Sequence, residues 1–265
     1  MSGERVAPRE LRDFLLSQGR PWITLEDAAA ILGTSEPIAA DALAYLRKVH
    51  QFFSPSPGLY VPLPPEYKSW GALPAADFID PLMTHLRHGY YVGLLSAAEL
   101  HGAAHQRPQV FQVITDARVR NRELGRARLR FYVSATAEDV PTQRMNVATG
   151  QIRVSTPATT AFDLVSRPSA AGGLNNVATV LYELADDGLL TASGWSASAS
   201  WYPAAILRRT GWLLDQIGVA ADQDGLLDAA GKPGPRVYLD PTAAHRGSGA
   251  NRWNLVVNTD VEPDL

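Results

Sequence analysis

Three short amphipathic segments and a hairpin pattern fill the first 62 residues, and this pattern restricts the fold more than any other feature of the chain. Apolar residues recur at helical spacing over 9–18, 25–32 and 35–49. Gly19 and Gly33 follow the first two segments, and glycine commonly ends a helix in the left-handed conformation. The sequence therefore predicts three short helices separated by tight turns.

Residues at the helix starts support these boundaries. Thr24 and Asp27 have the spacing of a capping box before the second helix, and Pro37 falls in the first turn of the third, which begins at Thr34 or Ser35. In the third helix we expect one buried stripe formed by Ile38, Ala42, Tyr45, Leu46 and Val49. The outward positions would then include Ser35, Glu36, Ala39, Ala40, Leu43, Arg47 and Lys48.

A β-hairpin is expected next, with strands over 51–53 and 59–61 and a turn rich in serine and proline over 54–58. Two helices, a tight turn, a third helix and a two-stranded ribbon follow the order of a winged helix-turn-helix, which binds DNA. A small helical module for protein interaction is the alternative for this block.

The third helix would enter the major groove, but its first two turns carry no asparagine, glutamine or arginine to read base edges. The nearby cations and hydroxyl groups could hold phosphates instead. The candidate DNA-binding residues are Arg20, Thr34, Ser35, Arg47, Lys48, His50, Ser54 and Ser56.

Four prolines between residues 62 and 77 interrupt both helical and strand patterns, so we expect a linker over 66–77. It would separate a winged helix-turn-helix domain over 1–65 from a larger domain over 78–265. The larger domain mixes both patterns and predicts an α+β fold. Helices are expected over 79–88, 94–101, 157–165, 175–187 and 203–217, and strands over 110–115, 126–133, 151–154, 237–239 and 253–257, with a surface loop or helix start over 191–200.

Composition excludes several classes of protein. The chain has 265 residues, of which 46% are hydrophobic, so it can bury a core and is not a disordered chain. It contains no cysteine, which excludes disulfides, a thiol nucleophile and a cysteine zinc site. The N-terminus lacks the apolar segment of a signal peptide, and no apolar stretch is long enough to span a bilayer. We expect a cytoplasmic protein.

One segment is strongly basic although the net charge of the chain is −3. Residues 118–130 contain six arginines and one acidic residue, Glu123, which gives this segment a net charge of +5. It could be a solvated hairpin or a ridge that contacts DNA or a partner protein. The arginines of this ridge are Arg118, Arg120, Arg122, Arg126, Arg128 and Arg130.

No motif in the chain argues for catalysis, and we expect no enzyme activity, cofactor or metal. His101 and His105 have the helical spacing of a zinc pair, but Gly102 stands where a metalloprotease has its glutamate. Asp222 and Asp224 have the spacing of nucleotidyltransferase metal ligands, but the Gly-Ser signature that precedes such a pair is missing. No phosphate-binding P-loop and no nucleophile elbow is present.

Four segments in order resemble the AbiEi family of antitoxins, from type IV (abortive infection) toxin–antitoxin pairs. They are YYVGLLSAAELHG (90–102) with the strand VFQVIT (110–115), IRVSTPATTAFDLV (152–165), RRTGWLLDQIG (208–218) and NRWNLVVN (251–258).

The resemblance implies a bacterial transcriptional repressor whose winged helix binds inverted repeats in the double-stranded DNA of its own promoter. The sequence does not reveal the oligomeric state, and we expect a monomer that binds the repeats cooperatively. The resemblance also implies a C-terminal domain that counteracts a cognate nucleotidyltransferase toxin encoded beside it, without being an enzyme itself. In such antitoxins, basic surfaces like the ridge assist DNA binding or antitoxicity.

Two alternatives remain at this point. The chain could be a stand-alone winged-helix regulator whose C-terminal domain senses a ligand or protein partner, in which case no toxin gene would lie beside it. A nuclease is the other alternative, and it needs a clustered aspartate, glutamate and lysine on adjacent strands. The chain has only three lysines, Lys48, Lys68 and Lys232, and none has such a setting.

Overall fold

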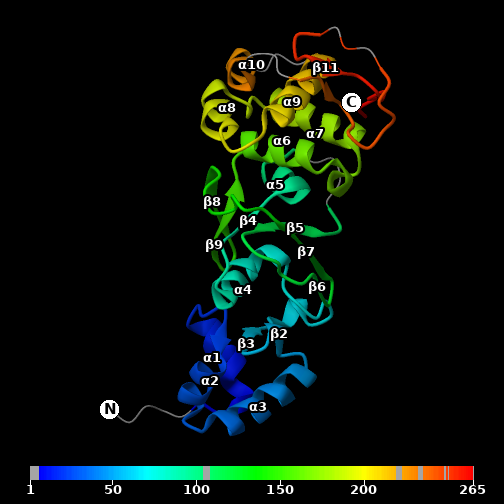
Figure 1. Ribbon diagram of the computed structural model, residues 1–265. Helices are drawn as coiled ribbons and strands as arrows, with labels where there is room; N and C mark the ends of the chain where they lie inside the picture. The colour runs from blue at the N-terminus through cyan, green and yellow to red at the C-terminus, as the bar shows by residue number, and fades with distance from the viewer. Residues whose placement is uncertain are drawn as a thin grey trace.

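The computed structural model describes residues 6–103, 108–218, 223–231, 235–247, 249 and 251–264. Its elements form three tiers, with the N-terminal helices at one end, a mixed sheet in the middle and a helical layer at the other end (Figure 1). The described part of the chain is therefore α+β, as predicted. Among the described residues, no helix combines the length and apolar character needed to cross a membrane.

The N-terminal tier contains three helices and a small antiparallel sheet of strand order β1-β3-β2. A short 3-10 helix over Pro8–Glu10 leads into the first α-helix. The elements of this tier are α1 (Leu11–Ser17), β1 (Ile23–Thr24), α2 (Leu25–Leu32), α3 (Glu36–Lys48), β2 (Phe52–Ser56) and β3 (Leu59–Pro62).

The predicted cap of α2 is confirmed. The Thr24 hydroxyl accepts a hydrogen bond from the backbone N–H of Asp27 at 3.1 Å, and the Asp27 carboxylate accepts one from the Thr24 N–H at 2.9 Å. Gly33 ends the helix in the left-handed conformation, with φ of 60°. Ser35 is the N-cap residue of α3, and Pro37 lies in its first turn.

The predicted buried face of α3 is wrong. Ala39, Leu43 and Leu46 are buried, whereas Ile38 is 61% exposed and Tyr45 is 64% exposed. The apolar positions of this helix form two adjacent stripes at helical spacing, and Leu46 belongs to both. Periodicity alone cannot tell which stripe meets the core, and the structure buries the one that packs with α1 and α2.

The middle tier is a six-stranded mixed sheet with strand order β6-β7-β5-β4-β9-β8. Parallel pairing joins β5 to β7 and β4 to β9, and the remaining neighbours are antiparallel. Strands near 111–115, 127–133 and 150–155 confirm predictions, and three further strands were not predicted. The bounds are β4 (Tyr90–Val92), β5 (Phe111–Thr115), β6 (Arg122–Leu124), β7 (Ala127–Val133), β8 (Thr142–Val147) and β9 (Gly150–Ser155).

Helices cover the sheet and form the third tier. The segment 191–200 forms a helix with a fully buried tryptophan, Trp195. The helices are α4 (Ile79–Leu86), α5 (Leu94–Leu100), α6 (Pro157–Ser166), α7 (Leu174–Asp186), α8 (Ala192–Ala199), α9 (Ala204–Ile217) and α10 (Asp224–Ala230). The short strands β10 (Val237–Tyr238) and β11 (Leu255–Val256) pair in parallel near the C-terminus, and 3-10 helices span Pro65–Tyr67, Ala75–Asp77 and Pro168–Ala171.

The expected linker is packed against both neighbouring tiers. Leu63, Ala72 and Leu73 are buried in one apolar cluster with Phe53 of β2 and Leu82 of α4. This cluster runs from the β2–β3 hairpin, through the proline-rich segment, to one face of the six-stranded sheet. The domain boundaries stay a prediction, and the apolar core is continuous across them.

Candidate functional site

A cleft of about 550 Å³ lies between the end of α3 and the β6–β7 turn. Arg47, Lys48 and His50 line one wall, and the turn around Gly125 lines the other. Ser54 also lines this cleft, so the structure places four of the predicted DNA-binding residues beside the basic ridge, although about 70 to 75 residues separate them from it in the sequence.

A close backbone contact fixes the far wall of this cleft. Gly125 lies against Trp70, where a Cβ atom would come within 1.9 Å of the Trp70 carbonyl oxygen. The N–H of Arg126 donates to the same carbonyl at 2.9 Å, and its guanidinium lies 5.2 Å from the centre of the Trp70 ring. The proline-rich segment thus holds the β6–β7 turn in a defined position relative to α3.

The six arginines of the ridge do not share one surface. Arg122 lies on the apolar side of β6, where burial lowers the pKa of its guanidinium. Arg130 pairs with Glu123 at 3.3 Å. Arg126 and Arg128 line a second hollow of about 400 Å³, together with the rings of Tyr67, Trp70 and Phe111, while Arg118 and Arg120 are exposed before β6.

Arg20, Thr34, Ser35 and Ser56 do not line this cleft, and the hydroxyl of Ser54, which does, is already hydrogen-bonded. The Arg20 guanidinium donates to the Asp27 carboxylate at 3.1 Å and so supports the cap of α2 rather than the α3 cleft. Thr34 is half-buried and Ser35 is exposed at the start of α3. The Ser54 hydroxyl donates to the carbonyl of Ser56, and Ser56 itself is only 6% exposed.

The tip of the β2–β3 hairpin packs against α4. The His85 ring lies 2.9 Å from the Pro57 carbonyl oxygen, and a Cβ atom added at Gly58 would lie 3.5 Å from the same ring. Phe53 packs edge-on against Phe78, with ring centres 5.2 Å apart. The hairpin therefore joins the N-terminal tier to the sheet, and its turn is largely covered.

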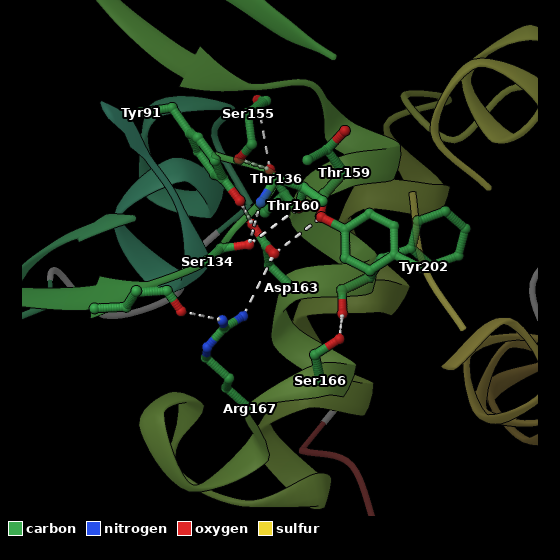
Figure 2. Close-up of polar contacts among 12 residues, drawn as sticks. Tyr91, Ser134, Thr136, Ser155, Thr159, Thr160, Asp163, Ser166, Arg167 and Tyr202 are labelled. Carbon is green, nitrogen blue, oxygen red and sulfur yellow. Dashed lines mark hydrogen bonds and ion pairs between the residues drawn. The ribbon is translucent and has the colours of Figure 1, made fainter. Parts of the chain in front are cut away.

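A second site lies inside the sheet domain, where the buried carboxylate of Asp163 on α6 meets three segments (Figure 2). It accepts hydrogen bonds from the hydroxyls of Tyr91 on β4 and Tyr202, each at 2.9 Å. Arg167, the C-cap residue of α6, approaches the Asp163 carboxylate to 3.8 Å and donates to the Val133 carbonyl at the end of β7. One carboxylate thus connects the sheet, α6 and the segment before α9.

Burial dominates the electrostatics of this network. Asp163 is 1% exposed, and burial raises the pKa of its carboxyl group to about 6, although Arg167 and the two tyrosine hydroxyls act in the opposite direction. Burial and the neighbouring carboxylate also raise the pKa of Tyr91 and of Tyr202. A carboxylate enclosed in this way positions other groups, because a substrate cannot reach it.

Asp163 and Tyr91 belong to the two sequence segments that carried most of the resemblance, and further contacts join these segments. His101 lies 2.8 Å from the Ser155 carbonyl oxygen, and burial lowers the pKa of its ring. The Ser155 hydroxyl contacts Thr160 at 2.7 Å, and Thr159 contacts Ser198 of α8 at 3.0 Å. The segments 90–102 and 152–165 therefore pack directly on each other.

The metal candidates gain no support in the described part of the chain, where no three histidine, aspartate or glutamate side chains gather as a metal site would require. His101 has a packing role as described. His105, Asp222 and the side chain of Asp224 lie outside the described residues.

Comparison with known proteins finds a family for the part of the chain that contains the Asp163 network. Residues 91–216 match the family model of the AbiEi antitoxin C-terminal domain. The crystal structure of the RV2827C protein from Mycobacterium tuberculosis superposes with a TM-score of 0.68 at 17% identity, covering 96% of this chain and 93% of that one. At this identity the likeness concerns the fold. No curated protein matches the chain.

Proposed function

Because residues 91–216 form an AbiEi antitoxin C-terminal domain, we propose that this chain is the antitoxin of a type IV toxin–antitoxin pair. The observation that carries the proposal is the family match, which spans the Asp163 network and the two segments packed around it. The antitoxin counteracts a cognate nucleotidyltransferase toxin and has no enzyme activity of its own. It acts in the cytoplasm.

We propose further that the N-terminal tier is a winged helix-turn-helix that represses the operon by binding inverted repeats in its promoter. The order of helices, the tight turn at Gly33 and the β1-β3-β2 sheet support this reading. The chain binds DNA as a monomer, and two copies bind the repeats cooperatively.

Phosphate contacts come from the end of α3 and not from the hairpin tip. Arg47, Lys48 and His50 are exposed at the cleft, whereas the hairpin turn packs on α4. Exposed arginines of the ridge, Arg126 and Arg128 among them, add cationic charge on the other side of the β6–β7 turn. The two sets together supply the positive charge that a duplex requires.

Binding of the purified protein to its own upstream DNA across a salt series tests the repressor role. The double variant Arg47→Ala, Lys48→Ala should bind more weakly, and its dependence of log K on log salt should be shallower by about one per lost phosphate contact. Arg246→Ala, an exposed arginine of the C-terminal segment, is the matched control and should bind normally. Equal binding by all three proteins, or no binding at low salt, would remove the repressor role.

Co-expression with the neighbouring nucleotidyltransferase gene tests the antitoxin role. The wild-type chain should restore growth, and co-purification would show whether the toxin is contacted directly. Changing Arg126, Arg128 and Arg130 to glutamate tests the function of the ridge. Loss of operator binding, of toxin neutralisation or of both would show which activity needs these arginines. If both activities are retained, the ridge is only a solvated strand. If no nucleotidyltransferase gene lies beside this one, a stand-alone regulator becomes the better description.

A further inference from the structure

The outward face of α3 is apolar at its centre. Ile38 and Tyr45 are 61% and 64% exposed, and half-buried Ala42 lies between them at helical spacing. Most exposed helix faces of a folded domain are polar, so an apolar stripe on the face that leads away from the core requires an explanation.

The polar residues on this part of α3 are carboxylates. Glu36 and Asp41 are exposed, and the first two turns carry no amide or guanidinium group that could donate to a purine. In the major groove, the apolar group on a base edge is the C5-methyl of thymine, and a carboxylate can accept a hydrogen bond from the amino group of cytosine. Both features of this face therefore fit pyrimidines.

Charge around the stripe indicates which partner covers it. Lys48 lies one turn beyond Tyr45, and Arg47 and His50 follow at the cleft, all three exposed. An apolar stripe with cations at its end complements a polyanion that carries methyl groups, and duplex DNA is such a partner.

Resting on the DNA-binding role proposed above, we infer that α3 selects its operator by burying thymine methyl groups against Ile38, Ala42 and Tyr45. The recognised half-site is rich in thymine on the strand that faces this stripe. The cations at the end of α3 hold the adjacent phosphates, and the stripe supplies the sequence preference.

The test replaces thymine by deoxyuridine, which removes only the methyl group and leaves the base-pairing edge intact. The probe is the promoter duplex bound by the purified full chain, prepared with thymine or with uracil throughout. Wild-type protein should bind the uracil duplex more weakly, by about fourfold for each methyl group that is buried. The double variant Ile38→Ala, Tyr45→Ala should bind the thymine duplex more weakly and respond little to uracil.

Two controls separate the methyl contact from other effects. Val133→Ala removes an apolar side chain that is 51% exposed at the end of β7 and should keep the full response to uracil. Tyr45→Phe keeps the ring and should also keep that response. Circular dichroism confirms that each variant is folded.

The possible outcomes are distinct. If the wild-type chain binds promoter DNA equally well with thymine and uracil, the methyl readout is wrong while the repressor role stands. If the Ile38 and Tyr45 changes alter the sedimentation of the free protein or its capture of the toxin, and uracil has no effect, the stripe is a protein interface. Absence of any promoter binding overturns both the repressor role and this inference.

Discussion

The Asp163 carboxylate serves two tyrosine hydroxyls and one guanidinium inside the sheet domain. Asp163→Ala would leave these donors buried without an acceptor, and each such group costs about 1–3 kcal/mol. We expect the free energy of unfolding to fall by about 3 kcal/mol in urea titrations. Asp139→Ala, an exposed aspartate, is the matched control and should change it by less than about 0.5 kcal/mol. Equal effects of the two changes would contradict a role for the network.

The pH dependence of stability gives a second test of the same residue. The pKa of Asp163 is about 6 in the folded protein and takes its ordinary value of 3.8 in the unfolded chain, so the folded state binds the proton more tightly. The part of the stability that is linked to this proton is therefore full below about pH 4 and is lost as the pH rises through about 6, whereas the hydrogen bonds from the two tyrosines to the carboxylate remain above that pH.

Asp163→Asn removes this titration. Between pH 4 and pH 6 the wild type should lose about 2 kcal/mol of unfolding free energy relative to Asp163→Asn. At higher pH the difference between the two proteins should change little. Urea titrations of both proteins at several pH values provide the measurement. A difference that does not change with pH would mean that the carboxyl group keeps its ordinary pKa.

The sequence could not identify this network. Asp163 resembles an ordinary polar residue within an amphipathic helix, and its tyrosine partners lie 72 and 39 residues away. Only the pairing of β4 with β9 and the packing of α6 bring them together. The resemblance to the antitoxin family identified the segments that contain Tyr91 and Asp163, but it did not indicate that these two residues interact.

At the scale of elements, α9 contains Gly211, a residue type with low helix propensity, at the point where the Trp253 ring packs against the helix. A Cβ atom at Gly211 would lie 2.2 Å from the Trp253 ring, whose indole N–H donates to Asp215 of the same helix at 2.7 Å. Gly211→Ala should therefore lower the free energy of unfolding by about 2 kcal/mol through overpacking. Thermal unfolding followed by circular dichroism measures this.

Gly225 in α10 is the matched control, because nothing lies within 4 Å of its added Cβ atom. Gly225→Ala should raise the stability slightly, by about 0.5 kcal/mol, since alanine restricts the unfolded chain and favours the helix. If both alanine variants were more stable than the wild type, Trp253 would not pack against α9 as described.

Elements were predictable where the signals were local. The capping box at Thr24 and the glycine at residue 33 define α2 at the expected residues. The orientation of α3 was not predictable, because two apolar stripes satisfy the same periodicity and tertiary packing decides between them. For the same reason, Ile38 and Tyr45 were predicted to be buried although they are exposed.

At the scale of the whole molecule, the prolines predicted a linker between two separate domains, but the apolar core continues through this segment. Proline prevents a helix or central strand in the segment 62–77, but it does not prevent that segment from being buried. The hairpin, this segment and α4 share one apolar cluster. Removal of residues 1–65 would expose the sheet side of that cluster, so point variants test DNA binding more safely than truncation does.

The shared cluster predicts that the N-terminal tier and the sheet lose structure together. Phe53→Ala removes the ring that packs on Phe78 and should cost about 3–5 kcal/mol, and it should weaken hydrogen-exchange protection in both the hairpin and α4. Leu15→Ala opens a cavity of comparable cost in the separate core of α1, α2 and α3, and it should leave protection of α4 unchanged.

Because the hairpin connects α3 to the sheet, loss of α4 protection in the Phe53 variant alone would show that this contact fixes the position of α3 relative to the β6–β7 turn. Unchanged protection of α4 in both variants would mean that the two tiers open independently and that the cleft between them has no fixed width.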